Sequence, residues 1–223
     1  MPAHIDVLAV GRGSSLRAFE EINVRDSIQN AGFIDFGYAL KIPSFAPVAI
    51  QNDGFMTTVM MDSQFGFTID GVGEWRVGDR DHLFAQGGSI VNGPDHLISS
   101  GHGIGTLRVP FQSSESLGFI NFGSVQSGEG QLILSGTTEN FGLMRTEDNG
   151  DLVVRGLTNH GTLQIDSGII ATLHTTNTAS GTIEGDGTLS MHGTAPITLT
   201  SYGLISPGTG QSPVGNLNTG RER

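Results

Sequence analysis

The stretch Asn140-Phe-Gly-Leu-Met-Arg-Thr146 is followed 19 residues later by Asn159-His-Gly-Thr-Leu-Gln-Ile165. An earlier copy begins at Asn121, and degenerate copies surround Gly181 and Gly203, so the glycines lie 19, 19, 20 and 22 residues apart. An apolar residue stands two positions after each glycine: Val125, Met144, Leu163, Ile183 and Ile205. A repeat of about twenty residues predicts a solenoid, in which neighbouring coils together bury a core that no single coil can bury.

A second set of positions supports strands in every coil. Apolar residues alternate with polar ones at Leu132 and Leu134, Leu152 and Val154, Ala171 and Leu173, and Leu189 and Met191. Alternation places one strand face in the core and the other in solvent. We therefore expect these residues to be buried, with Met144 stacked directly on Leu163.

Glycine and asparagine recur at the corners of the predicted coils. Glycine contributes 34 of the 223 residues. Both residue types tolerate a positive φ, which predicts left-handed backbone at the corners. Stacked asparagines are also expected to form a ladder of amide hydrogen bonds along the rod.

The whole pattern predicts an all-β fold, a right-handed parallel β-helix (β-solenoid) of about ten coils. We divide it into an N-terminal cap or irregular segment (1–26), irregular coils with loops (27–118), regular coils of 19–22 residues (119–205) and a terminal coil or tail (206–223). Leu16 to Ile22 is expected to form a short capping helix, and 57–88 and 110–118 fit the repeat poorly and are expected to hold loops that leave the rod. The alternative fold is an antiparallel sandwich with glycine turns.

Composition restricts the classes of function. The chain carries 22 acidic against 11 basic residues, a net charge of −11. Such a chain repels phosphate backbones and anionic lipid, so we expect no nucleic-acid partner and no membrane insertion of this segment. Cysteine is absent, and neither a signal peptide nor a membrane-spanning run is visible. If the protein is exported, this chain is expected to be part of a longer one.

Residues 119–217 carry a resemblance to a known family. Gly181-Thr-Ile-Glu-Gly-Asp-Gly-Thr-Leu189, Gly203-Leu-Ile-Ser-Pro-Gly208 and Ser212-Pro-Val-Gly-Asn-Leu217 resemble coils of bacterial autotransporter passengers and related β-helical surface proteins. Three residues separate Gly208 from Ser212, more than is usual in that family. The resemblance implies a β-helix at the bacterial cell surface, outside the outer membrane, with an adhesive or structural role and host or cell-surface glycans or proteins as partners.

A second resemblance points to an enzyme. Asp79-Arg-Asp81-His82 followed by Gly101-His102-Gly103 is similar to the acidic pair and Gly-His-Gly of pectin-degrading β-helical hydrolases. Asp81 and His102 lie 21 residues apart, a spacing that would align them on adjacent coils. The upstream Asn-Thr-Asp of those enzymes is missing, however, and no lysine follows Lys41.

Other chemistry has weaker support. Glu147-Asp148-Asn149-Gly150-Asp151 fits neither the helix–loop–helix calcium loop nor the calcium β-roll repeat. Phe122 and Phe141 share a repeat position and are expected to stack, either as corner or core packing or as an external sugar platform. We expect no catalytic residue, cofactor or metal site, and predict a non-enzymatic, adhesin-like solenoid. The alternative is a pectin-type hydrolase or a polysaccharide lyase with a site near Asp79, Asp81 and His102.

Overall fold

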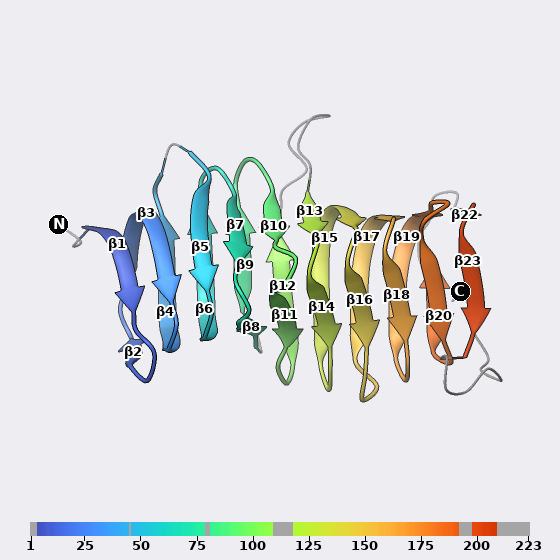
Figure 1. Ribbon diagram of the computed structural model, residues 1–223, viewed down its shortest axis with the longest axis horizontal. Helices are drawn as coiled ribbons and strands as arrows, with labels where there is room; N and C mark the ends of the chain where they lie inside the picture. The colour runs from blue at the N-terminus through green and yellow to red at the C-terminus, as the bar shows by residue number, and fades with distance from the viewer. Residues whose placement is uncertain (1–3, 45, 79–80, 109–117, 192–197, 209–223) are drawn as a thin grey trace.

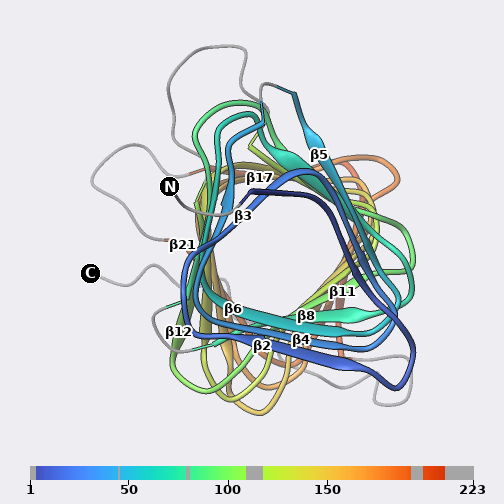
Figure 2. The ribbon, with the colours of Figure 1, turned by 90° about the vertical axis from the view of Figure 1, so that its left-hand side faces the viewer.

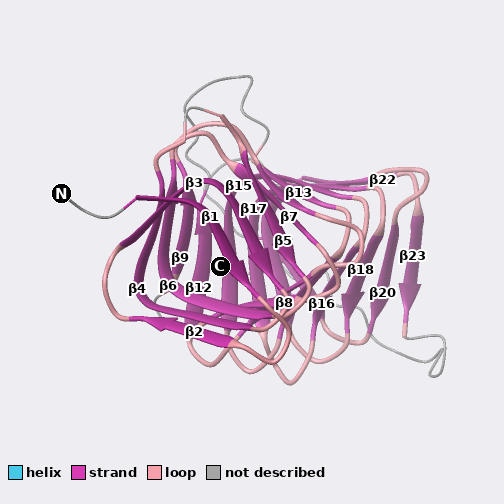
Figure 3. Ribbon diagram, turned by 60° about the vertical axis from the view of Figure 1, so that its left-hand side comes forward, coloured by secondary structure: helices cyan, strands magenta, loops and turns pink. Residues whose placement is uncertain are grey.

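The computed structural model describes residues 4–44, 46–78, 81–108, 118–191 and 198–208. These residues form 23 strands and no helix, stacked as a β-solenoid of about nine turns rather than ten (Figures 1 and 3). The chain winds in the predicted right-handed sense (Figure 2). Among the described segments, none is a helix long and apolar enough to cross a membrane.

Each turn of the solenoid contributes to three faces, which enclose the core (Figure 2). Face A contains β2 (Ser15–Ala18), the first half of β4 (Phe33–Ile42) and of β6 (Phe55–Ser63), β8 (Glu74–Val77), β11 (Leu97–Ser100), β14 (Ser124–Ser127), β16 (Leu143–Thr146), β18 (Thr162–Ile165), β20 (Thr182–Gly185) and β23 (Leu204–Pro207). All neighbours on this face pair in parallel, so one column of side chains runs the length of the rod.

Face B contains the second halves of β4 and β6, followed by β9 (His82–Ala85), β12 (Ile104–Arg108), the first halves of β15 (Gln131–Asn140), β17 (Asp151–Asn159) and β19 (Ile169–Asn177), and β21 (Thr188–Met191). Face C contains the ends of β1 (His4–Val10) and β3 (Ile22–Asn30), β5 (Val48–Asn52), β7 (Phe67–Asp70), β10 (Ile90–Asn92), β13 (Phe119–Asn121), the ends of β15, β17 and β19, and β22 (Thr198–Ser201). The beginnings of β1 and β3 belong to face B, where β3 pairs with the second half of β4.

The core columns confirm the repeat. Met144 is in register with Leu163, and both are fully buried, as are Val125 and Ile183 in the same column. Ile205 is 38% exposed instead, because β23 is the last described strand of face A and no described strand stacks on its outer side.

Two expectations for the N-terminal half are wrong. Residues 16–22 form no helix: Leu16 lies in β2 and is in register with Ile34, so alternation and stacking decide this segment. Residues 57–88 do not fit the rod poorly, since they contain most of β6 and all of β7 to β9, with Phe67, Trp75 and Leu83 in the core. Of the second predicted loop, residues 110–117 lie outside the described residues.

The assignment of one regular coil is also wrong, and Met191 in the following coil is half-buried rather than buried. Ala171 and Leu173 face outward, whereas Ile170 and Thr172 are buried. Apolar residues occupy both the odd-numbered and the even-numbered positions of this strand, so alternation alone does not show which set is buried. Register decides instead, because Ile170 stacks between Leu152 and Leu189.

The expected positive φ is found at eight described glycines, among them Gly66, Gly88 and Gly103, but at the Asn-x-Gly corner glycine and asparagine recur for a different reason. Among the described non-glycine residues only Asp148 and Asn149 have positive φ, and Gly142 and Gly161 do not. A Cβ on Gly142 or Gly161 would overlap the carbonyl oxygen of the corresponding glycine in the preceding coil. Close approach of stacked backbones therefore selects glycine at this corner, and the asparagines serve the hydrogen-bond ladder.

Candidate functional site

The asparagine ladder forms at the end of face C. The Nδ2 of Asn121 donates to Asn140 Oδ1, that of Asn140 to Asn159 Oδ1 and that of Asn159 to Asn177 Oδ1, each at 2.8 Å. These four asparagines are buried, with exposed fractions of 0%. The ladder satisfies buried amides along the rod and fixes the register of the coils, because a slipped coil would leave donors and acceptors unpaired.

His96 repairs the ladder where one coil has no asparagine. β7 pairs with β5 through Ile69 and Ile50, but with β10 through Ile69 and Asn92, so the register slips by two residues in this coil. The imidazole spans the gap, with Nε2 2.9 Å from Asn52 Nδ2 and Nδ1 2.8 Å from Asn92 Oδ1. Sequence reasoning missed this role, although Asp95-His96 stands close to a ladder asparagine.

The ladder also determines the tautomer of His96. Nε2 must accept from Asn52, whereas Nδ1 donates its proton to Asn92. A second proton on Nε2 would face the Asn52 amide, another donor. Burial lowers the pKa of His96 to about 4, and the carboxylates of Asp70 and Glu74 oppose this shift only in part.

Acidification is therefore expected to destabilise the protein through His96. The folded pKa is depressed from 6.5 to about 4, so between these values the unfolded chain binds the extra proton. Stability from this group is complete above pH 6.5 and falls by roughly 3 kcal/mol as the pH drops to about 4. Urea unfolding at several pH values measures the slope. The His96→Gln variant is expected to lose this part of the pH dependence and the exposed-site variant His102→Gln to keep it; an unchanged slope in His96→Gln would contradict the assignment.

A polar groove of about 290 Å³ lies on the outer side of face A. Its lining comes from β8, β11, β14 and the turns that follow β11 and β14, and includes Glu74, Arg76, Ser99, His102, Gln126 and Glu129. Arg76 donates to Glu74 at 2.8 and 3.0 Å, and Ser99 donates to the same carboxylate. His102 Nδ1 lies 2.8 Å from Glu129, with both side chains mostly exposed. Each of these two carboxylates in the groove therefore lies within ion-pair distance of a basic side chain.

The structure does not place Asp81 and His102 in one register column. His102 lies in the polar groove, whereas Asp81 is 5% exposed, is not part of the lining, and accepts the Gly78 amide with Oδ2. The 21-residue spacing does not align them, because His82 pairs with Thr106 and the Thr106 amide donates to Asp81 O. Asp79 lies outside the described residues.

The positions of the groove residues Arg76, Ser99 and Gln126 follow a pattern that the sequence also contains. Arg76, Ser99, Gln126 and Arg145 occupy one register column of face A. In each regular coil this position directly follows the buried apolar residue, at Gln126 after Val125 and at Arg145 after Met144. Because side chains alternate between the two faces of a strand, the residue after each buried apolar residue is expected to point outward, and these residues form the column.

Two aromatic stacks lie on the surface, and their ring faces are largely covered. Phe122 and Phe141 are about two-fifths exposed and stack at 5.1 Å, and Phe141 stacks on His160 at 4.5 Å. Phe141 therefore has a ring on both faces, which leaves only its edge for a sugar. Phe33 and Phe55 stack at 5.5 Å between Arg17 and Arg76, whose guanidinium carbons lie 5.6 and 5.1 Å from the ring centroids. Both stacks join neighbouring coils.

No protein-family model matches the chain, and neither a curated protein nor a solved structure is significantly similar to it.

Proposed function

We propose that this chain is a non-enzymatic, structural and adhesin-like segment of a secreted or cell-surface bacterial protein. The observation that carries the proposal is the continuity of the rod: three strand faces extend through about nine turns, and a buried amide ladder runs from Asn30 to Asn177, with His96 bridging the coil that has no asparagine. Such a rod is a stiff spacer with repetitive outer faces. The resemblance of residues 119–217 to autotransporter passengers supports the placement at the cell surface.

The polar groove on face A is the proposed contact surface for glycans or proteins. The groove contains the ion pair of Glu74 with Arg76 and the contact of His102 with Glu129. The Ser100 hydroxyl and the Gln126 amide beside them are hydrogen-bonded within the chain, so a ligand would contact polar groups held in fixed positions. Inverting hydrolysis needs one protonated acid and one carboxylate base on either side of the scissile bond. Because the Glu74 carboxylate is already paired with Arg76, the groove favours the binding of neutral polar groups over this chemistry.

Surface exposure is tested on intact cells of the producing bacterium, with antibody raised against the folded chain. The expected result is labelling before permeabilisation and its removal by externally added protease. Labelling that requires cell lysis would contradict the proposed location.

Catalysis is tested by incubating the purified chain with pectin, polygalacturonate and alginate, with and without calcium. The expected result is no gain in reducing ends or unsaturated products. Turnover that disappears in Asp81→Asn or His102→Ala would instead establish the hydrolase or lyase alternative.

A further inference from the structure

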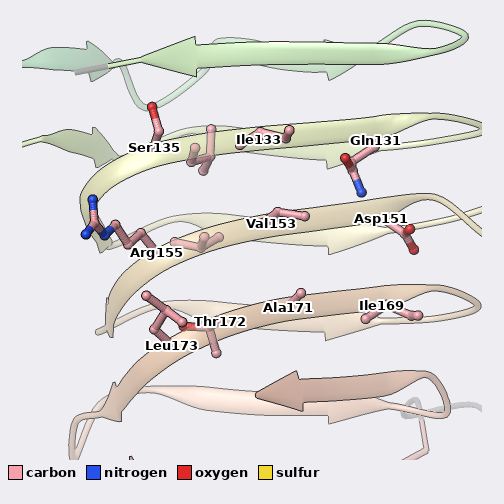
Figure 4. Close-up of a pocket in the computed structure, with 12 residues that line it drawn as sticks. Gln131, Ile133, Ser135, Asp151, Val153, Arg155, Ile169, Ala171, Thr172 and Leu173 are labelled. Carbon is pink, nitrogen blue, oxygen red and sulfur yellow. The ribbon is translucent and has the colours of Figure 1, made fainter. Parts of the chain in front are cut away.

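An apolar groove of about 640 Å³ lies on the outer side of face B, across β15, β17 and β19 (Figure 4). Its middle column consists of Ile133, Val153 and Ala171, which are in register with one another and half-buried. A column two residues earlier contains Gln131, Asp151 and Ile169. Ser135, Arg155 and Leu173 flank the middle column on its other side, where the register of β15 with β17 shifts after Leu134. Apolar side chains on an outer sheet face cost solvation energy unless another surface covers them.

The chemistry of the two flanking columns is matched strand by strand. β15 carries a neutral polar residue on each side of Ile133, namely Gln131 and Ser135. β17 carries opposite charges on the two sides of Val153, and β19 carries an aliphatic residue on each side of Ala171. Exchanging the flanking columns therefore pairs like polarity with like polarity and places Asp151 opposite Arg155.

We propose that this groove is an interface between two copies of the chain, related by a twofold axis that runs between them, parallel to the solenoid axis, along the middle column. This symmetry reverses strand direction and keeps the order of the coils. Asp151 of each copy faces Arg155 of the other, Ile169 faces Leu173, and Gln131 faces Ser135. Ile133 and Val153 each meet their own counterparts, which gives an apolar centre with polar flanks, as in isologous interfaces.

Charge complementarity selects this arrangement over the other simple one. A twofold axis parallel to the strands would place Asp151 opposite Asp151 and Arg155 opposite Arg155, so both pairs of facing charges would repel each other. The matched pattern is confined to β15, β17 and β19: toward β12 the middle column continues at the uncharged Thr106, but Arg108 is in register with Ser135 in the flanking column. Toward β21 the middle column continues at Ser190, which is 1% exposed and offers no surface to a partner.

The size of the groove predicts a weak dimer. Stable interfaces bury about 800 Å² on each partner, and the matched positions span only three strands of face B. We therefore expect a dissociation constant on the order of 10 to 100 μM.

Analytical ultracentrifugation of the full chain between about 1 and 300 μM tests the proposal. The expected result is a reversible shift from 23.4 kDa toward twice that mass. Asp151→Arg and Arg155→Asp are each expected to raise the dissociation constant at least about tenfold, because like charges then meet at two symmetric positions. The double variant restores both pairs with exchanged charges and is expected to return within about threefold of the parent value.

Glu184→Arg is the matched control, since it changes net charge as Asp151→Arg does but lies on face A. It is expected to leave the dissociation constant within about threefold of the parent value. A chain that stays monomeric throughout the range would overturn the proposal. So would a dimer that tolerates both single reversals, or a double variant no tighter than the single ones.

Discussion

Replacing Asn140 by aspartate is expected to lower the free energy of unfolding at neutral pH by about 4 kcal/mol. The two side chains have the same shape, but the Nδ2 of Asn140 donates to Asn159 Oδ1 at 2.8 Å and to the carbonyl oxygens of Gly142 and Thr162 at 3.2 Å. A carboxylate would present an oxygen to all three acceptors at a site with no solvent exposure. Its charge would have neither water nor a cation to stabilise it.

The penalty in Asn140→Asp is expected to shrink on acidification. Protonation restores one donor, so burial and the facing oxygens raise the pKa of the introduced carboxyl above its unfolded value. Relative to the parent protein, the loss then falls by about 1.4 kcal/mol per pH unit below that raised pKa. Paired urea titrations at several pH values measure it. Asn149→Asp makes the same substitution on an exposed turn residue and is expected to cost less than about 1 kcal/mol; equal losses would refute the ladder's role.

The second large effect distinguishes two adjacent valines. Val154 is 1% exposed and stacks between Leu134 and Thr172, whereas Val153 points outward in the groove of face B. Val154→Asp loses the burial of a valine and places a charge in the core, so we expect a loss of about 4 kcal/mol or more. Val153→Asp introduces the same residue at the neighbouring position of the strand, so the poor β-propensity of aspartate affects both variants. Because Val153 points outward, this variant is expected to lower the free energy of unfolding by about 1 kcal/mol or less.

Thermal and urea unfolding at about 1 μM, where the chain is expected to be monomeric, measures both variants without a contribution from association. The same Val153→Asp protein is expected to remain monomeric at high concentration. Similar losses of stability in the two variants would show that the register of β17 is wrong.

The regular coils were predictable because each carries the same inward pattern. Val125, Met144, Leu163 and Ile183 were identified by their spacing from a glycine, and all four are buried in one column. The N-terminal coils follow the same physics at irregular spacing. Phe67 is a core residue there, but the residues of its column, Val48, Phe67, Ile90 and Phe119, follow one another at unequal spacings of 19, 23 and 29 residues. Residues 57–88 were therefore expected to hold loops that leave the rod.

The two grooves were harder to predict than the core, because they are formed by side chains on the outer faces of the strands, and the repeat pattern was interpreted only for the inner faces. The coil around Ala171 was assigned in the wrong parity since both of its faces are apolar, and the residues misassigned to the core are those that line the groove of face B. A strand apolar on both faces conflicts with the alternation of its neighbours, and such conflicts mark candidate binding surfaces. His96 was missed because its function depends on a register slip between β5, β7 and β10, which only the paired strands reveal.

The central claim, a continuous stack of parallel coils, is tested most directly by spin-label distances along face A. The chain has no cysteine, so pairs can be introduced at outward positions of one register column. From Arg17 in β2, Gln126 lies five register steps away, Gln164 seven and Glu184 eight. At about 4.8 Å per step, backbone separations of about 24, 34 and 38 Å are expected, each lengthened by a similar label contribution. Double electron–electron resonance distances that increase in this order and by these increments would support the solenoid, whereas distances that fail to grow with register step would contradict it.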